Sequence, residues 1–241
     1  MKKVIVILSA MILFSGCAAT QVALSKKDLK VENRMSATIF LDVDNMAEKS
    51  IYLDIRNTSA KDIDITPFVL SNLEGKGYKI TKDAKSAFYL MQANILFVGQ
   101  ADQTALEQSV TAGFGGALAG AAVGAAASGA SNSSILTGAA VGGLIGGAAE
   151  MLSGSFVKDV TYSIITDIQI SEKTKEKVEQ DSQAELETGA ESSTTQTSET
   201  TVNRKKYQSR LATTANQVNL TFEEAQPMIE EGLIRAISGL F

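Results

Sequence analysis

Residues 108–149 read QSVTAGFGGALAGAAVGAAASGASNSSILTGAAVGGLIGGAA, and this stretch decides how the chain folds. It contains no Asp, Glu, Lys or Arg, whereas the sequence on either side is charged. A polar break, Ser131-Asn132-Ser133-Ser134, divides it near the middle. We therefore interpret residues 108–152 as a transmembrane α-helical hairpin, with arms at 110–130 and 135–152 and a tip formed by the four polar residues.

The lengths of the two arms fit a membrane. At about 1.5 Å per residue, the first arm would rise roughly 31 Å and the second about 27 Å. The hydrocarbon core of a bilayer is about 30 Å thick, and the bacterial outer membrane is thinner than average. Both arms are therefore long enough to cross an outer membrane.

Small residues recur at four-residue intervals along both arms, so they fall on one face of each helix. They are Ala112, Gly116, Gly120, Gly124 and Ser128 in the first arm, and Gly138, Gly142 and Gly146 in the second. This spacing lets helix backbones approach closely and is typical of helices that associate in lipid. Two other interpretations stay open. The stretch could be a helix pair buried in a protein core, or a flexible linker, because Gly is a poor helix former in water.

The N-terminus supplies a second attachment to the membrane. Two lysines precede an apolar run, residues 4–14, that is too short to span a bilayer, and Ser15-Gly16-Cys17 follows. This order resembles a bacterial lipoprotein signal, in which small residues precede a Cys that becomes the lipidated N-terminus. We expect residues 1–16 to be removed, Cys17 to carry an N-acyl chain and an S-diacylglycerol, and residues 17–36 to form a lipidated tether.

The sequence on either side of the hairpin predicts one α+β domain. Apolar alternation indicates strands at 37–43 and 51–57, a helix at 64–77, and strands at 78–81 and 87–98. After the hairpin, strands at 156–171 and 205–220 precede a last helix that opens at residues 221–224. The polar segment 174–203 is interpreted as a long loop with a mobile tip, and a weakly marked pair of strands is the alternative. Residues 37–107 and 153–241 would then form a single periplasmic strand-helix-strand domain, with the hairpin 108–152 inserted in it.

Composition argues against catalysis and against several kinds of binding. The chain has no His, no Trp and a single Cys, so the usual general base and the usual zinc ligands are missing. We predict no catalytic residue, no metal site and no cofactor other than the lipid on Cys17. A net charge of −5 leaves no electrostatic footprint for nucleic acid. The basic runs at 173–177 and 204–206 are interpreted as solvated surface charge, and contact with anionic lipid headgroups is the alternative for 204–206.

Six blocks of sequence carry a family resemblance. They are YLDIRNTS (52–59), KGY (76–78), QANIL (92–96), GAAVGA (120–125), VTYSIITDIQI (160–170) and VNLTFEEA (218–225). In this order they resemble the TraT family of outer-membrane lipoproteins of conjugative plasmids, and the match covers most of the mature chain. The sequence departs from the family around residues 128–134 and 188–201, where the specificity for partners is least determined.

The resemblance implies surface exclusion, in which stable mating contact between two donor cells is blocked, and an associated resistance to complement. Together with the hairpin, it leads us to expect a ring of copies zipped through glycine in the outer membrane of a Gram-negative bacterium. The domain would be periplasmic and the hairpin tip would lie at the cell surface. The expected partners are outer-membrane lipid, other copies of the chain, and the pilus tip or outer-membrane proteins of the mating cell. The alternative is a pore-forming or adaptor lipoprotein of the envelope without a role in conjugation.

Overall fold

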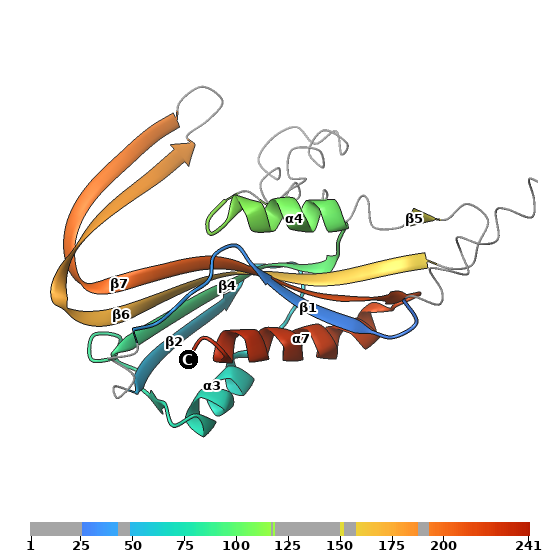
Figure 1. The fold of residues 1–241 in the computed structure, drawn as a ribbon, viewed down its shortest axis with the longest axis horizontal. Coiled ribbons are helices and arrows are strands. Elements are labelled where there is room, and N and C mark those ends of the chain that lie inside the picture. Colours follow the sequence, from blue (N-terminus) through green and yellow to red (C-terminus); the bar gives the residue numbers. More distant parts are fainter. Residues whose placement is uncertain (1–25, 43–48, 117, 119–149, 152–157, 188–192) are drawn as a thin grey trace, which may run out of the picture.

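The computed structural model describes residues 26–42, 49–116, 118, 150–151, 158–187 and 193–241. Within these ranges, one mixed sheet carries helices on both of its faces (Figure 1). The elements, in chain order, are β1 (Lys30–Met35), β2 (Ser50–Asn57), α3 (Thr66–Gly75), β3 (Lys79–Ile80), β4 (Tyr89–Gln100), α4 (Gln103–Ala112), β5 (Glu150–Met151), β6 (Lys158–Glu187), β7 (Ser193–Val218) and α7 (Phe222–Ser238).

The strands lie in the order β1-β7-β6-β4-β2-β3 across the sheet. The pairs β1–β7, β7–β6 and β6–β4 are antiparallel, whereas β4–β2 and β2–β3 are parallel. Parallel neighbours need a crossover connection, and α3 supplies the one between β2 and β3. The short β5 pairs with the first residues of β6, Lys158 and Asp159, beyond the point where β4 ends.

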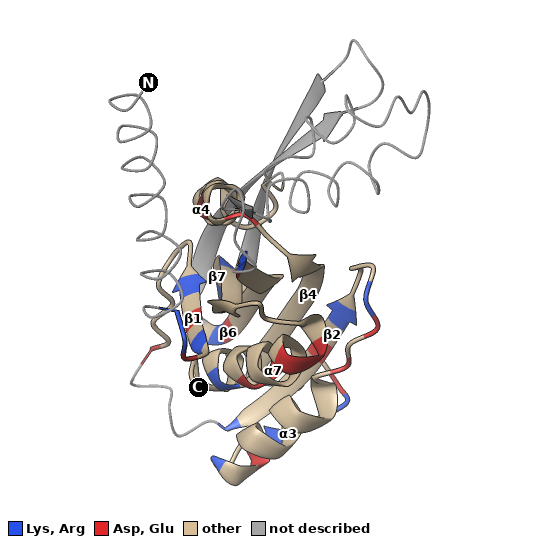
Figure 2. Ribbon diagram, turned by 90° about the vertical axis from the view of Figure 1, so that its right-hand side faces the viewer, with Lys and Arg blue, Asp and Glu red and all other residues tan. Residues whose placement is uncertain are grey.

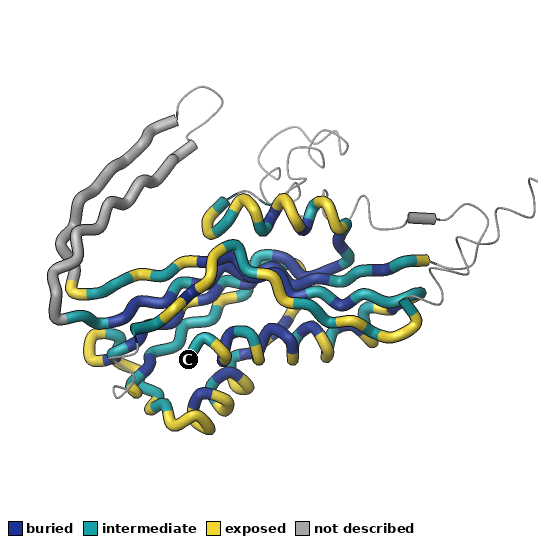
Figure 3. Tube along the Cα trace, in the orientation of Figure 1, coloured by how far each residue is buried: buried dark blue, intermediate teal, exposed yellow. Residues whose placement is uncertain are grey.

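Alternation along the strands sends apolar side chains into two cores on opposite faces of the sheet. The larger core lies under α3 and α7 and contains, among others, Ile51, Leu73, Met91, Ile95, Ile164, Ile168, Leu211, Ile229 and Leu233. The smaller core lies under α4 and consists of Phe97, Ala101, Leu106, Ile165 and Ala212. Figures 2 and 3 show α4 on one side of the sheet and α3 with α7 on the other, with buried residues between them. The α4 side is therefore the thinly covered side.

Helix α7 is fixed by its cap and by a close approach to the sheet. The Thr221 hydroxyl accepts the N–H of Glu224, and the Glu224 carboxylate accepts the N–H of Thr221, which makes a capping box. Gly232 faces the place where β1 and β7 pair. A Cβ at this position would lie 2.9 Å from both Thr213 Cγ2 and Val31 Cγ1, so only glycine lets the helix lie this close.

Most of the predicted elements outside the hairpin are confirmed. The strands predicted at 51–57 and 87–98 are β2 and β4, and the helices predicted at 64–77 and from residue 221 are α3 and α7. The strand predicted at 156–171 is the first part of β6, and it packs on the larger core through Val160, Tyr162, Ile164, Ile168 and Ile170. The α+β class is thus confirmed as a mixed sheet with few helices.

Helix α3 lies within the predicted range 64–77 and has Pro67 in its first turn, but no side chain caps its N-terminus. The N-cap position is Ile65, which makes no side-chain capping bond. Instead, the carboxylate of Asp64 accepts the N–H of Thr66 at 2.9 Å. Hydrogen bonds from Thr66 hold the pKa of the Asp64 carboxyl below its ordinary value.

The first strand lies earlier than predicted. The prediction placed it at 37–43, whereas β1 is Lys30–Met35 and pairs with β7, inside the segment assigned to the tether. Val31 and Met35 of β1 pack against the larger core, which gives this polar strand its register. Residues 38–42 form no strand, and Phe40 is 80 % exposed. The domain therefore begins before residue 37, and the tether is shorter than 17–36.

The polar segment 174–203 contains a paired ribbon, so the prediction of a long loop is wrong and its alternative, a pair of strands, is correct. β6 and β7 stay in register from the pair Val178–Val202 to the pair Glu187–Ser193. The rest of the sheet ends before this point, because β4 reaches only Glu172 of β6. The sequence of this ribbon lacks the apolar alternation that marks the other strands, so periodicity alone does not identify it.

Candidate functional site

The two ends of the predicted hairpin are the parts of it that the structure describes. Ala112 is the last residue of α4, and Gly116 lies in the loop that follows it. At the other end, Glu150 and Met151 form β5. The other predicted functional residues lie outside the described residues: Cys17, Gly120, Gly124, Ser128, Ser131, Asn132, Ser133, Ser134, Gly138, Gly142 and Gly146.

Helix α4 ends at Ala112, inside the uncharged stretch and just before its first glycine, Gly113. Its N-cap, Asp102, accepts hydrogen bonds from two backbone N–H groups of the first turn, and Leu106 holds the helix on the sheet. It stops at Ala112 because Gly113 has φ +74° and Gly115 has φ +72°, in the left-handed region that a helix does not continue through. The prediction of one helix from 110 to 130 is therefore wrong at its start.

The second arm also differs from its prediction at the described end. Because β5 pairs antiparallel with β6, a helix running to residue 152 is wrong at its last residues. None of the helices in the described part of the chain combines the length and the apolar character required to span a bilayer. For residues 117 and 119–149, which lie outside the described residues, the hairpin stays a prediction.

A buried ion pair lies beneath the start of the glycine-rich segment. Asp167 of β6 and Arg210 of β7 are direct cross-strand partners on the α4 side of the sheet. Arg210 Nε donates to Asp167 Oδ1 at 2.7 Å, and Arg210 Nη2 donates to Asp167 Oδ2 at 3.0 Å. The two side chains are only 1 % and 10 % exposed. This is the two-pronged geometry that suits Arg and carboxylate best.

The same two side chains also bind the backbone of α4 and of the loop after it. Arg210 Nη1 donates to the carbonyl of Ser109 at 3.2 Å, and Nη2 donates to the carbonyl of Gly116 at 2.8 Å. Asp167 Oδ2 accepts the N–H of Gly115 at 2.9 Å. We call this set of hydrogen bonds the exit clamp, because it fixes the backbone at the point where the glycine-rich segment leaves the sheet.

The C-terminal end of the glycine-rich segment, at β5, lies at the same end of the sheet as Lys26. Glu150 of β5 pairs with Asp159 of β6. Lys26, the first described residue, forms an ion pair with Asp159, and its carbonyl accepts the N–H of Val218 at 3.1 Å. Asn216 also donates to Asp159, at 2.7 Å. This group, which we call the return corner, therefore joins the predicted tether and the returning segment at one place.

Polar side chains make up much of the remaining α4 side of the sheet. Gln208 donates to Gln169 at 2.7 Å, and Gln169 donates to Gln92 at 3.0 Å, so that an amide ladder crosses β7, β6 and β4. On β2, Arg56 donates to Asp54 at 2.8 Å. Part of this surface borders a groove of 260 Å³ whose lining contains no Ser, Thr, Cys or Lys. The groove therefore offers hydrogen-bonding groups, namely the carboxylates of Asp54 and Asp167, the guanidinium of Arg56 and several amides.

A second polar cluster, on the α7 side of the sheet, is built around the buried carboxylate of Glu172. Tyr207 Oη donates to Glu172 at 3.1 Å, the N–H of Asp42 donates to it at 3.3 Å, and Lys205 pairs with Asp42 at 3.3 Å. Burial, followed by the bond to Glu172, raises the pKa of Tyr207 to about 12. Burial likewise raises the pKa of Tyr89. These bonds tie the segment after β1 to the sheet.

The described residues therefore bring together anchoring groups, and the sequence analysis missed the main ones. They contain no group of three or more His, Cys, Asp or Glu able to hold a metal ion. Asp167 and Arg210 were not selected, although each is a charge in a strand with apolar neighbours, in SIITDIQI and SRLATTA. Charges at matching places in two adjacent apolar strands are the signal that could have identified the pair.

Comparison with known proteins places these features in a family. The family of Enterobacterial TraT complement resistance proteins matches residues 28–241. A TraT complement resistance protein of Escherichia coli is 40% identical over 242 residues, covering 97% of this chain and 95% of the relative. A second, from Escherichia coli strain K12, is 37% identical over 237 residues, covering 98% and 96%.

Proposed function

The chain belongs to the TraT family of complement resistance proteins, and from that premise we propose that it is an outer-membrane lipoprotein that mediates surface exclusion and complement resistance. In this proposal, Cys17 carries the lipid and the glycine-rich hairpin crosses the outer membrane. The domain lies on the periplasmic side and the tip at Ser131–Ser134 lies outside. The protein acts by contact rather than by catalysis.

The observation that best supports this arrangement is the return corner. The tether and the returning end of the glycine-rich segment meet at Asp159, so one face of the domain can hold both against a membrane. Between Cys17 and Lys26 the chain can extend at most about 30 Å, at about 3.3–3.6 Å per residue. A lipidated Cys17 would therefore keep the return corner within about 30 Å of the membrane surface.

The exit clamp gives the other end of the segment a fixed origin. Asp159 and Asp167 lie on the same strand, about 26 Å apart at about 3.3 Å per residue. Both attachments of the segment thus belong to one rigid element, β6. The position of the sheet would therefore determine where both ends of the segment enter the membrane.

Glycine spacing supports the assembly of several copies. In lipid, helices associate by close packing and not by a hydrophobic drive, and faces of Gly, Ala and Ser permit that packing. An Ala/Gly-rich segment is also only marginally hydrophobic, since insertion scales reward Leu, Ile and Phe more strongly. We expect such a segment to pass the inner membrane and to insert in the outer membrane once several copies have zipped together.

In this proposal, the hairpin tips at residues 131–134 bring about surface exclusion. A ring of hairpins would present many copies of the 131–134 tip to an approaching cell, where they would compete for contacts of the pilus tip or of outer-membrane proteins. We expect contacts of this tip to contribute to the choice of the partner that is excluded.

The decisive experiment is an epitope inserted at Asn132 of the full lipidated chain. Antibody should bind intact cells, whereas the same epitope at the exposed Lys61 of the domain should need permeabilised cells. Labelling at Asn132 only after permeabilisation would show that the hairpin does not cross the membrane.

A second experiment links assembly to function. Replacing Gly120 and Gly124 by Leu should leave lipidation intact, abolish the oligomer on native mass analysis, and reduce both mating exclusion and survival in serum. Val123→Leu, in the same segment but away from the small-residue face, is the matched control. An unchanged oligomer in the glycine variant contradicts the glycine zipper, and loss of the oligomer with full exclusion contradicts the link.

A further inference from the structure

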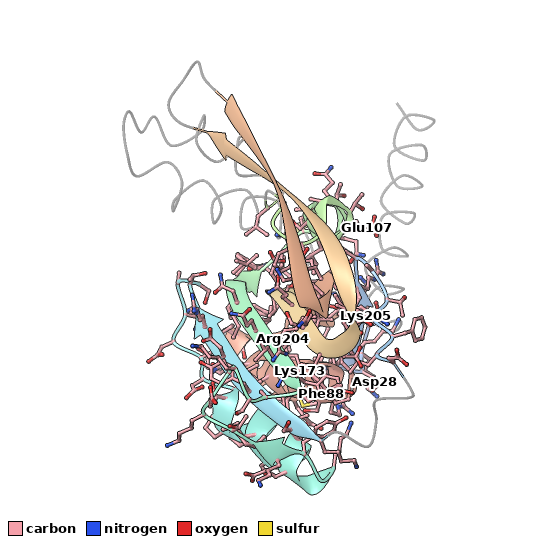
Figure 4. All side chains as sticks on the ribbon, turned by 90° about the vertical axis from the view of Figure 1, so that its left-hand side faces the viewer. Asp28, Phe88, Glu107, Lys173, Arg204 and Lys205 are labelled. Carbon is pink, nitrogen blue, oxygen red and sulfur yellow. The ribbon has the colours of Figure 1, made fainter. Side chains whose placement is uncertain are left out.

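The groove on the α4 side of the sheet lies beside the loop that follows α4. Phe114 lines it from this loop, and the rest of the lining comes from β2, β4 and β6. Along β6, the lining residues lie between Ile165, which packs under α4, and Lys173. Figure 4 shows Lys173 with Arg204 at the foot of the ribbon, and Glu107 on α4.

The polar side chains of the groove form two rows across β2, β4 and β6, in which neighbours are direct cross-strand partners. The rows are Asp54, Gln92 and Gln169 in one, and Arg56, Asn94 and Asp167 in the other. Direct partners share a face of the sheet, on strands about 4.7–4.9 Å apart. The sheet therefore holds six planar polar groups at short, regular spacing.

Two amides in these rows keep donors that the described part of the protein does not use. Gln208 donates to Gln169 and Gln169 donates to Gln92, so the ladder ends at the amide nitrogen of Gln92. The amide oxygen of Asn94 accepts the hydroxyl of Thr58 at 3.2 Å. Among the described residues, neither amide nitrogen has an acceptor. Because a chain of hydrogen bonds polarises its members, the terminal N–H group of Gln92 is a good donor.

The charges of the groove are already paired. Arg56 donates to Asp54 at 2.8 Å, and Arg210 binds Asp167 through two hydrogen bonds. These two pairs carry no net charge, so an anion such as phosphate gains no excess of positive charge here. An apolar ligand would desolvate the amides without offering them partners, which is unfavourable. The lining therefore favours a neutral ligand with donors and acceptors of its own.

Phe114 adds an apolar wall to this polar site. It is 39 % exposed, and its neighbours Gly113 and Gly115 both have positive φ. Asp167 accepts the N–H of Gly115 at 2.9 Å, so the backbone beside the ring is fixed at the groove. An aromatic surface beside a few convergent polar groups is the usual composition of a site for a small ligand.

A sugar ring matches both parts of the groove. A pyranose carries hydroxyls around its edge, each able to donate and to accept, and C–H groups on its face that pack on an aromatic ring. An acetamide substituent matches further, since its carbonyl can accept from Gln92 or Asn94 and its N–H can donate to Asp54. The groove of 260 Å³ is smaller than the roughly 300–1,000 Å³ of sites for drug-sized ligands, so it suits one or two rings of a longer chain.

We propose that this groove binds a neutral glycan of N-acetylated hexose rings. Phe114 stacks on the face of a ring, while Gln92, Asn94 and Asp54 bond to its acetamide and hydroxyl groups. Every residue of the site lies in the described domain, so this binding does not depend on the membrane hairpin. The cell wall and the glycolipid of the outer membrane both contain such rings, and the experiment separates these two sources.

The first test is calorimetric titration of the full lipidated chain in a detergent without a sugar headgroup. The probe is the tetramer of N-acetylglucosamine, and the control is the glucose tetramer with the same linkage, which lacks only the acetamide groups. The N-acetylated tetramer should bind, and the glucose tetramer should bind about tenfold more weakly because it cannot form the acetamide hydrogen bonds. Equal affinity for the two tetramers, or binding of neither, would overturn the proposal.

Side-chain changes locate the binding. Phe114→Ala and Gln92→Leu should each weaken it about tenfold, whereas Phe114→Tyr, which keeps the ring, should retain it. The matched controls are Phe68→Ala, an exposed Phe of α3, and Gln226→Leu on α7, both on the opposite side of the sheet, and they should leave the affinity unchanged. Unchanged affinity in both Phe114→Ala and Gln92→Leu would show that the tetramer binds elsewhere and would overturn the proposal.

Co-sedimentation with isolated cell-wall sacculi and binding to purified lipopolysaccharide separate the two sources of the glycan. The source that the groove recognises should retain the unchanged chain and Phe68→Ala but lose Phe114→Ala. Retention by neither source would overturn the proposal. If wall peptides freed from the glycan bind in place of the N-acetylated tetramer, the ligand is a peptide and the proposal fails.

Discussion

Replacing Arg210 by Met tests whether the exit clamp holds the start of the glycine-rich segment. The change removes four hydrogen bonds while keeping a side chain of similar length. Asp167 would then be left with the N–H of Gly115 as its one remaining hydrogen-bond partner among the described residues. The carbonyls of Ser109 and Gly116 would lose the donors that now bind them.

The expected cost is about 3–5 kcal/mol, the amount typical of removing one partner of a buried ion pair. Solvent screens this ion pair very little, because its two side chains are only 1 % and 10 % exposed. Such a loss is a large part of the roughly 5–15 kcal/mol that stabilises a typical domain. The double variant Arg210→Met with Asp167→Leu should recover about 2 kcal/mol, because no charge is then left buried without its partner.

Urea unfolding of the full chain in detergent, followed by circular dichroism, would measure these costs. Amide hydrogen exchange at 109–116 should accelerate in the single variant before the rest of the sheet is affected. Arg56→Met is the matched control, since Arg56 also pairs with an Asp on the same side of the sheet but is exposed, and it should leave unfolding unchanged. A loss below about 1 kcal/mol for Arg210→Met, or no recovery in the double variant, would refute the clamp.

Three further predictions concern the frame around the clamp. Gly232→Ala should destabilise the chain by about 1–3 kcal/mol, because the new Cβ would lie 2.9 Å from side chains of β1 and β7. Gly75→Ala is the control and should not destabilise it, because no atom lies within 4 Å of a Cβ at that position. Equal urea midpoints for the two variants would contradict this prediction. Thr221→Ala should cost about 0.5–2 kcal/mol by removing the capping box of α7, measured in the same way. The pKa of Tyr is near 10 in the unfolded chain, and that of Tyr207 is about 12 in the folded chain. Tyr207 should therefore add its full stabilisation to the free energy of unfolding below about pH 10, and this stabilisation should be lost as the pH rises toward 12. Tyr207→Phe should flatten this alkaline slope in unfolding measured at several pH values, and an unchanged slope would show that the phenol is not responsible.

The sequence predicted elements wherever periodicity and burial coincide. β2, β4 and α7 carry apolar residues at strand or helix spacing and pack on the larger core, so pattern and structure agree. β1 was misplaced because Val31 and Met35 are its main apolar contacts, while the more apolar residues after it form no strand. The ribbon of β6 and β7 was missed for the related reason that its sequence carries no apolar alternation.

The candidate site was harder to predict because it depends on long-range register. Asp167 and Arg210 face each other only because β6 and β7 pair in one register, and a slip of one residue would put them on opposite faces. The prediction of where the hairpin begins was wrong for a local reason. Val110 and Ala112 continue the pattern of small and apolar residues, but the backbone after them turns left-handed at Gly113 and Gly115.

A charged clamp suits this position better than an apolar contact would. Glycine-rich sequence specifies its own conformation weakly, since each Gly in a helix costs about 1 kcal/mol relative to Ala. Apolar side chains in place of Asp167 and Arg210 could fill the same space, but they could not bind the N–H of Gly115 or the carbonyl of Gly116. The ion pair recognises those peptide groups by direction, and hydrogen bonds to charged groups are among the strongest a protein makes. It therefore fixes the place where the segment leaves the sheet, which the glycine-rich sequence could not fix by itself.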